Sequence, residues 1–212
     1  MRNAVKERSL FLESGEIRLE ALFAELQGAR GAVITHPHPL YGGDMHNSVV
    51  EAAVSAYRES GISTLRFNFQ GVGRSGGAFD QGLGERANVL SAVKSMSDSG
   101  RDKIDLVGYS FGAWVNAGCL QMKPAVERMV FISPPVTVLD FSFMQSAPSL
   151  KLVVIGSNDA YAPPEVIRKM IKLWKPAARL EVIEGADHFY QGYLDRVRDI
   201  LKDFLVQTSC RA

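Results

Sequence analysis

Short apolar runs of strand length alternate along this chain with longer segments whose apolar residues repeat with a helical period. Strands and helices that alternate in this way favour a mostly parallel sheet covered by helices on both faces. The run at residues 151–155 is almost continuously apolar, as expected for a strand that is buried on both sides. The sequence therefore predicts an α/β fold.

The pattern predicts about eight strands, with a helix between most of them. We expect strands at residues 9–13, 17–26, 32–35, 62–69, 104–108, 129–133, 152–156 and 180–183, and helices at residues 49–57, 83–96, 111–122, 163–174 and 190–205. The first two strands surround a turn at Gly15 and predict an antiparallel hairpin at one edge of the sheet. No repeat or linker interrupts the pattern, so we expect one domain over residues 1–212.

Charge and composition exclude several classes of partner. The 212 residues include 24 Lys and Arg against 23 Asp and Glu, a net charge of +1. Proteins that bind nucleic acids or anionic membranes carry a clustered basic excess, so we expect neither partner. Residues 1–10 lack the apolar core of a secretory signal, and we expect a cytoplasmic protein. Cys119 and Cys210 show no metal-ligand or C-x-x-C spacing, and we interpret both as structural or incidental.

A G-x-S-x-G pattern occurs where one predicted strand ends and a predicted helix begins. Gly108 and Gly112 flank Ser110 in this pattern. A serine on a sharp strand-to-helix turn has its hydroxyl exposed above the sheet, and flanking glycines prevent clashes. The pattern alone could arise by chance, and its position between a strand and a helix makes Ser110 a candidate nucleophile.

A serine hydroxyl needs a base to remove its proton, and the base needs a carboxylate to orient it. His188 follows the predicted strand at 180–183, and Asp159 follows the predicted strand at 152–156. Alone, His188 could be a surface histidine and Asp159 a helix cap. Asp187 is a weaker candidate, because adjacent side chains after a strand seldom point at each other. Ser110, Asp159 and His188 all lie just past the carboxyl ends of strands, where sites form in such sheets.

This placement and the chain order Ser, Asp, His resemble the α/β-hydrolase family over nearly the whole chain. Within that family the chain is similar to small, lidless bacterial hydrolases related to dienelactone hydrolase, on segments 36–43 (HPHPLYGG) and 66–76 (RFNFQGVGRSG). The resemblance implies an α/β-hydrolase fold, with a Ser110–His188–Asp159 triad. Dienelactone hydrolase has a cysteine nucleophile where this chain has Ser110, so its substrate does not carry over. Gln70 also stands where relatives often have arginine.

An oxyanion hole needs backbone N–H groups that point at the developing negative charge. The N–H of Phe111 is the expected first donor. Prolines have no N–H, so in segment 36–43 the second donor is expected to be His38, Leu40 or a later residue, and its position favours His38.

An apolar acyl pocket is expected from Tyr41, Phe141, Phe143, Met144, Tyr161 and Phe189. Core packing would explain these apolar residues equally well. The connection from about 133 to 151 is too short for a cap domain, which predicts an open site.

Two other patterns suggest different chemistry and fit less well. Residues 71–76 match G-x-G-x-x-G, but the acidic residue that a dinucleotide site needs about 20 positions later is missing, and we interpret the glycines as a tight loop at the rim of the site. His36, His38, Asp44 and His46 could suggest a metal site. A binuclear H-x-H-x-D-H motif would place an aspartate where Leu40 stands, and we expect no metal.

The sequence therefore predicts a serine hydrolase that cleaves small carboxylic esters or thioesters through an acyl-enzyme, without a cofactor. The expected partner is a small-molecule ester. Two alternatives stay open: a non-catalytic protein that keeps the fold and binds a small ligand or a partner, and a hydrolase of amides or peptides. A homodimer also stays open.

Overall fold

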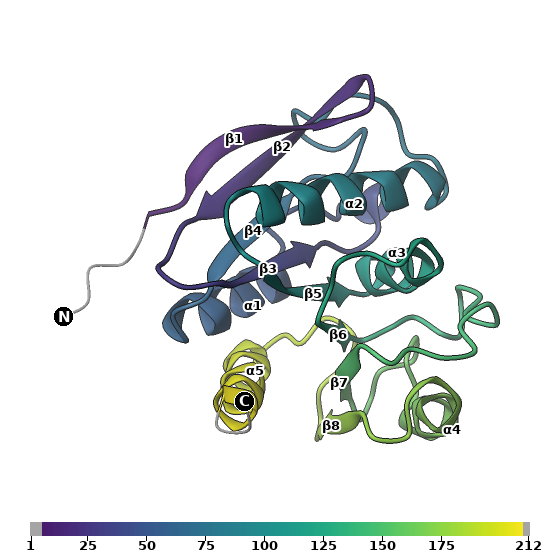
Figure 1. Ribbon diagram of the computed structural model, residues 1–212. Helices are drawn as coiled ribbons and strands as arrows, with labels where there is room; N and C mark the ends of the chain where they lie inside the picture. The colour runs from purple at the N-terminus through teal and green to yellow at the C-terminus, as the bar shows by residue number, and fades with distance from the viewer. Residues whose placement is uncertain (1–5, 210–212) are drawn as a thin grey trace.

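One mixed sheet forms the framework of the protein (Figure 1). The structure is a computed structural model that describes residues 6–209. Its strands are β1 (Arg8–Ser14), β2 (Ile17–Ala24), β3 (Arg30–Thr35), β4 (Ser63–Phe67), β5 (Lys103–Tyr109), β6 (Arg128–Ile132), β7 (Leu150–Gly156) and β8 (Arg179–Ile183). They form an 8-stranded sheet in the order β1-β2-β4-β3-β5-β6-β7-β8. Strands β3 to β8 are parallel, and β1 and β2 add an antiparallel hairpin at one edge, as predicted.

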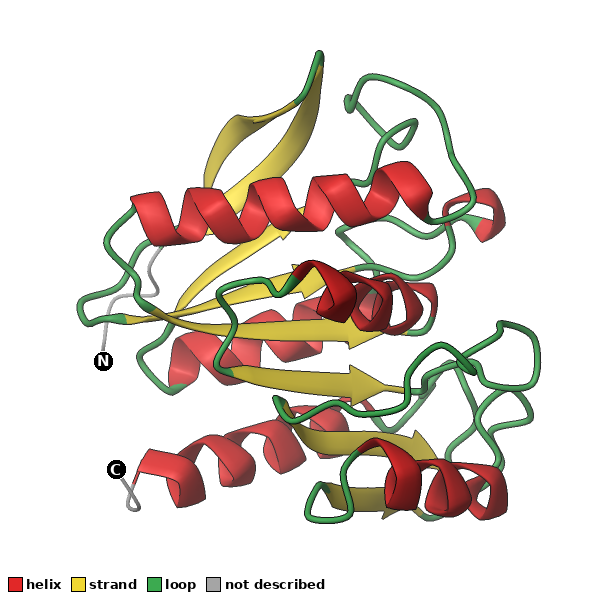
Figure 2. Cartoon of the chain, turned by 45° about the vertical axis from the view of Figure 1, so that its right-hand side comes forward, coloured by secondary structure: helices red, strands yellow, loops and turns green. Residues whose placement is uncertain are grey.

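Helices cover both faces of this sheet (Figure 2). They are α1 (Ser48–Glu59), α2 (Leu83–Asp98), α3 (Phe111–Cys119), α4 (Pro164–Trp174) and α5 (Leu194–Ser209), with short 3-10 helices η1 (Pro39–Tyr41) and η2 (Leu120–Met122). Helices α1 and α5 pack on one face, and α2, α3 and α4 pack on the other. Along β5, Leu106 faces the second group and Val107 faces the first, because successive side chains of a strand point to opposite faces.

The last helix begins later than the sequence pattern predicts. The structure starts α5 at Leu194, whereas the apolar period extends back to Tyr190. Tyr190 has a left-handed φ of 56°, and the Asp187 carboxylate accepts hydrogen bonds from the N–H groups of Phe189 and Tyr190. These turns keep the segment before Leu194 out of the helix. The helix predicted at 111–122 likewise ends at Cys119 and continues as η2.

The connection between β6 and β7 carries no cap domain. Residues 133–149 contain turns and bends without a helix.

Among residues 6–209, none of the helices has both the length and the apolar character needed to cross a membrane. Cys119 is buried on α3, and burial raises the pKa of its thiol to about 12. Cys210 lies outside the described residues.

An ion cluster ties three neighbouring strands together at their amino ends. Asp105 on β5 is fully buried and accepts hydrogen bonds from the Arg128 guanidinium on β6, at 2.8 and 2.5 Å. Arg30 on β3 donates a third hydrogen bond at 3.0 Å. Asp105 is the register partner of Arg128, so the pair forms directly between adjacent strands. The cluster lies at the opposite end of the strands from their carboxyl ends.

Replacing Arg128 by methionine should lower the free energy of unfolding by about 3–5 kcal/mol, because it removes a paired charge and leaves a buried carboxylate under-compensated. Urea unfolding of wild type and variant measures the difference. Arg30→Met is the matched control, because Arg30 is 23% exposed and its loss leaves the two Arg128 hydrogen bonds in place. An equal loss in both variants would contradict this ranking.

Candidate active site

Ser110 occupies a strained turn between β5 and α3. Its φ of 54° and ψ of −120° are values that L-residues rarely adopt. A Cβ at Gly108 would lie 2.6 Å from the backbone nitrogen of Ala113, and one at Gly112 would lie 2.8 Å from the carbonyl oxygen of His36. Glycine is therefore required on both sides of Ser110, because any larger residue would push the turn away from neighbouring backbone.

The structure brings together the three side chains that the sequence predicts as a triad. Nε2 of His188 lies 2.9 Å from Oγ of Ser110. Nδ1 of His188 lies 3.0 Å from both carboxylate oxygens of Asp159. All three residues are buried, with exposed fractions of 8%, 7% and 2% for Ser110, His188 and Asp159. The three positions are separated along the chain and meet at the carboxyl ends of β5, β7 and β8.

The surroundings of Asp159 fix the tautomer of His188. Burial by itself would raise the pKa of Asp159, but hydrogen bonds from His188, Ser133 and Ala162 and the electrostatic attraction of His188 together lower it below its usual value. An ionised carboxylate only accepts hydrogen bonds, so Nδ1 of His188 carries the proton. When the ring is neutral, the Nε2 lone pair therefore faces the Ser110 hydroxyl. This is the arrangement that a general base requires.

Asp187 plays a different part from Asp159. Its Oδ1 accepts hydrogen bonds from the N–H groups of Phe189, at 2.9 Å, and Tyr190, at 3.1 Å. The carboxylate thus shapes the turn that carries His188. Asp159, and not Asp187, is therefore the carboxylate that contacts the imidazole of His188.

Three residues near the triad were not predicted from the sequence as part of the site. Ser133 donates a hydrogen bond to Asp159, Tyr190 contacts Ser133, and Tyr109 donates to the carbonyl oxygen of His188 at 2.9 Å. Ser133 follows β6 directly, a strand-end position of the kind that Ser110 and Asp159 occupy. That shared position was the available signal for Ser133, whereas nothing in the sequence distinguishes Tyr109 or Tyr190 from core tyrosines.

Of the three N–H groups expected to bind an oxyanion, two make no hydrogen bond within the described part of the chain. Within residues 6–209, the N–H groups of Phe111 and His38 donate to no protein acceptor. The N–H of Leu40 donates to Nδ1 of His38 at 3.2 Å. This contact removes Leu40 from the candidate donors and corrects that expectation. The side chain of Leu40 also faces a different cavity, described below.

Ser110 and His188 open into a cavity of about 670 Å³. Of the residues expected in a substrate pocket, Tyr41, Tyr161 and Phe189 line it. None of its lining side chains is Asp, Glu, Lys or Arg. The complete lining is Pro37, His38, Tyr41, Gly42, Gly43, Asn47, Tyr109, Ser110, Phe111, Pro135, Val138, Leu139, Tyr161, His188 and Phe189. An uncharged, mostly apolar wall therefore surrounds the nucleophile.

The prediction that Phe141, Phe143 and Met144 line this pocket is wrong. Phe141 and Met144 are buried in the core on the α4 side of the sheet, and Phe143 packs against that core. The ring of Phe141 lies 5.4 Å from that of Trp174. The β6–β7 connection turns these side chains inward, because they cover the core beside α4. Pro135, Val138 and Leu139 from the same connection face the cavity instead.

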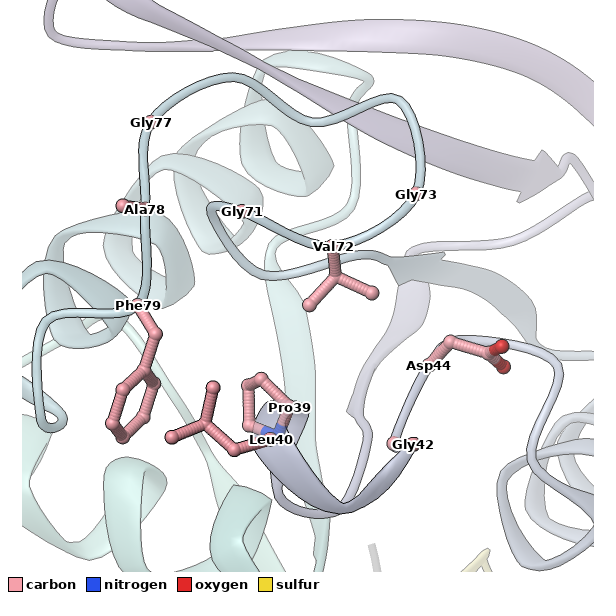
Figure 3. A pocket seen from close by; sticks show the side chains of 11 residues that line it. Pro39, Leu40, Gly42, Asp44, Gly71, Val72, Gly73, Gly77, Ala78 and Phe79 are labelled. Carbon is pink, nitrogen blue, oxygen red and sulfur yellow. The ribbon is translucent and has the colours of Figure 1, made fainter.

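A second cavity, of about 410 Å³, lies between segments 39–44 and 71–79. Figure 3 shows Leu40, Val72 and Phe79 around it, with the glycines of both segments at its edge. These include the G-x-G-x-x-G glycines Gly71 and Gly73. A dinucleotide site needs a helix that begins at this motif, whereas α2 begins only at Leu83. The glycines form a tight loop, as the sequence analysis interprets them.

Gln70 connects this loop to α2 by hydrogen bonds. Its Nε2 donates to the carbonyl oxygen of Ala78 at 2.7 Å, and its Oε1 accepts from Nδ2 of Asn88 at 3.3 Å. Asn88 also accepts the backbone N–H of Gln70 at 3.0 Å. Gln70 therefore holds both ends of the loop to α2.

His36 also has a structural role. It is fully buried, its Nε2 accepts the N–H of Phe69 at 3.0 Å, and its Nδ1 donates to the carbonyl oxygen of Pro37 at 2.7 Å. Burial lowers the pKa of His36 to about 4, so the ring is neutral at pH 7. Within residues 6–209, no group of three or more His, Cys, Asp or Glu side chains is placed to hold a metal ion, and His38, Asp44 and His46 do not gather around His36.

Comparison with known proteins places this chain in a family. No protein-family model matches the chain. The uncharacterized protein RP471 of Rickettsia prowazekii is 30% identical over 209 residues, which cover 93% of this chain and 88% of that protein. An alpha-beta serine hydrolase homologue from Coxiella burnetii is 30% identical, with a TM-score of 0.87 over 94% of this chain and 98% of the other. The chain belongs to the α/β-hydrolase family.

A further structure connects this α/β hydrolase to members without a lid. XC6422 of Xanthomonas campestris, a member of the α/β serine hydrolases without lid, is 29% identical. Its TM-score is 0.85, over 95% of this chain and 94% of the other. The short β6–β7 connection of this hydrolase is consistent with a fold without a lid. Residues 133–149 contain no helix that could cover the cavity above Ser110.

Replacing His36 by glutamine should remove a specific loss of stability in acid. The unfolded chain protonates this histidine near pH 6.5 and the folded protein only near pH 4, so between these values the unfolded state binds more protons. Lowering the pH from 7.5 to 4.5 should therefore reduce the free energy of unfolding of the wild type by about 2–3 kcal/mol more than that of His36→Gln. Denaturant unfolding at both pH values measures this. Equal acid losses in the two proteins would show that His36 is not held neutral.

Proposed function

We propose that this α/β hydrolase is a serine esterase that cleaves small carboxylic esters or thioesters through an acyl-enzyme. Its fold and motifs are similar to those of dienelactone hydrolase. The observation that carries the proposal is the continuous chain of hydrogen bonds from Ser110 through His188 to Asp159, with contacts of 2.9 and 3.0 Å. A structural serine would not need a histidine ring nitrogen directed at its hydroxyl. The free N–H groups of Phe111 and His38 add the second element of acyl transfer, a site for negative charge.

In the proposed reaction, Oγ of Ser110 attacks the carbonyl carbon while Nε2 of His188 takes the hydroxyl proton. Asp159 stabilises the imidazolium that forms, and the N–H groups of Phe111 and His38 hold the oxyanion of the tetrahedral intermediate. The intermediate collapses when the C–O or C–S bond breaks, and His188 gives its proton to the leaving alkoxide or thiolate. Water then attacks the acyl-enzyme with His188 as base. Ser110 regains its proton from His188 as the carboxylic acid leaves.

The wall of the cavity favours an uncharged substrate. It contains no Lys or Arg that could neutralise a carboxylate, and its exposed side chains are apolar or aromatic. Tyr41 is 88% exposed, Phe189 63% and Val138 60%. Moving a charged group onto such a surface costs solvation energy that no partner returns. The favoured substrate is therefore a neutral ester with an apolar acyl or alcohol group.

Ser110→Ala should reduce the turnover of a short p-nitrophenyl ester at least about a thousandfold, because the nucleophile is lost. Steady-state kinetics with purified protein measures the effect. Ser55→Ala is the matched control, because Ser55 lies on α1 and its hydroxyl donates a hydrogen bond to Oε1 of Glu59 at 3.0 Å, away from the triad. Equal turnover by wild type and Ser110→Ala would exclude Ser110 as the nucleophile, and no turnover by either protein would favour a protein that only binds ligands.

The charge preference can be measured with two esters of similar length, p-nitrophenyl butyrate and mono-p-nitrophenyl succinate. The wild type should hydrolyse the butyrate with at least about a tenfold higher kcat/KM, equivalent to about 1.4 kcal/mol. Val138→Lys should narrow this ratio by supplying a cation at the cavity. Leu173→Lys, on α4 outside the cavity and 70% exposed, should leave the ratio unchanged. A wild type that favours the succinate ester would refute the neutral-substrate proposal.

A further inference from the structure

Left-handed backbone is concentrated around the proposed triad. The described non-glycine residues with positive φ are Gln81, Ser110, Lys123, Ser133 and Tyr190. Ser110, Ser133 and Tyr190, with φ of 54°, 46° and 56°, all reach the same site. L-residues avoid this conformation, and it persists where the surrounding structure holds it in place, often at functional sites. Ser110 has a role in the proposed reaction, and the strain at Ser133 and Tyr190 calls for its own explanation.

Ser133 is directed at the proposed catalytic acid. It follows the last residue of β6, is fully buried, and its N–H donates to the carbonyl oxygen of Val154 on β7 at 2.8 Å. Its Oγ donates to Oδ2 of Asp159 at 2.5 Å. A serine hydroxyl has one hydrogen, so this contact uses the only donor that Ser133 offers.

Tyr190 completes the chain of hydrogen bonds from the other side. Its hydroxyl lies 2.7 Å from Oγ of Ser133 and 3.3 Å from the carbonyl oxygen of Val154. Because the Ser133 hydrogen is committed to Asp159, the single hydrogen of the Tyr190 hydroxyl is directed at Oγ of Ser133, the nearer of its two acceptors, rather than at the carbonyl oxygen of Val154. Burial raises the pKa of Tyr190 well above its ordinary value, so the phenol keeps its proton. A hydroxyl that accepts a hydrogen bond becomes a stronger donor, so Tyr190 strengthens the bond from Ser133 to Asp159.

We propose that Ser133, held by Tyr190, is a positioning residue that fixes the Asp159 carboxylate and limits how strongly this carboxylate attracts the proton of His188. Oδ1 of Asp159 is held by the N–H groups of Tyr161 and Ala162, each at 2.9 Å, and Oδ2 by Ser133. Each donor disperses the negative charge of the carboxylate. The imidazole is thus oriented without being driven to its protonated form, in which it could not act as a base. This inference rests on the proposed function.

Other titratable groups also face Asp159 and His188. Tyr109, at the end of β5, donates to the carbonyl oxygen of His188, and the Tyr161 ring lies 4.7 Å from the imidazole. Asp187 binds the backbone N–H groups of the turn after His188. Substitutions at Ser133 leave these three groups in place. A change in the protonation of His188 in such variants therefore reports the Ser133 hydroxyl.

The test compares Ser133→Ala, Ser133→Gly and Tyr190→Phe with the wild type. Two midpoints are measured: the acid-side midpoint of kcat/KM against pH with a neutral p-nitrophenyl ester, and the pH at which NMR shows His188 taking up its proton. Without the Ser133 hydroxyl, Asp159 attracts that proton more strongly. Both midpoints should therefore move upward by about 0.5–1 pH unit in the two Ser133 variants, and by less in Tyr190→Phe.

Ser133→Gly separates the hydroxyl from the backbone. Glycine adopts the left-handed φ of this position without strain, so this variant lacks the hydroxyl but fits the backbone better than alanine. The same upward shift in both variants would support a role of the hydroxyl. An unmoved or lowered midpoint in Ser133→Gly would overturn the inference. If the wild type showed no Ser110-dependent hydrolysis, the proposed function would fail, and the NMR midpoints would still decide the role of Ser133.

Discussion

The close approach of the β5–α3 turn to neighbouring backbone is the constraint on which the site depends. Ser110 reaches its left-handed conformation only because Gly108 has no Cβ to meet the backbone of Ala113 and Gly112 has none to meet the carbonyl of His36. This conformation raises the hydroxyl above the sheet edge and starts α3 at the next residue. The N–H of Phe111 is thereby left without a helical partner. One backbone geometry thus supplies both the candidate nucleophile and one donor for the oxyanion.

The parallel sheet then brings the remaining groups to that point. Strands β5, β6, β7 and β8 are adjacent, so Ser110, Ser133, Asp159 and the turn that carries His188 meet at one edge. Their side chains are linked by hydrogen bonds of 2.5 to 3.0 Å. The opposite ends of the central strands are joined by the buried Asp105 and its arginine partners. The carboxyl-end loops can therefore be specialised for chemistry while packing and ion pairs elsewhere maintain the sheet.

The sequence predicted the features that depend on periodicity and on strand ends. The apolar runs located every strand, and the positions just past them located Ser110, Asp159 and His188. The prediction of pocket residues failed where burial depends on tertiary packing. Phe141 and Met144 are apolar residues in a connection, and the sequence does not show whether such residues face a cavity or the core. Leu40 was misjudged because its N–H is used by a local contact with His38. Ser133 was missed because the predicted strand at 129–133 includes it, whereas β6 ends at Ile132 and leaves Ser133 at the strand end.

The central claim is that Ser110 is chemically activated by His188. Labelling with a fluorophosphonate, followed by mass spectrometry of the peptides, tests this claim without any assumption about the substrate. If His188 activates Ser110, one serine of the 18 in the chain is modified, this serine is Ser110, and labelling slows as the pH falls through the range in which histidines take up a proton. A protein that stays unlabelled, or that is labelled at another serine, would show that His188 does not activate Ser110.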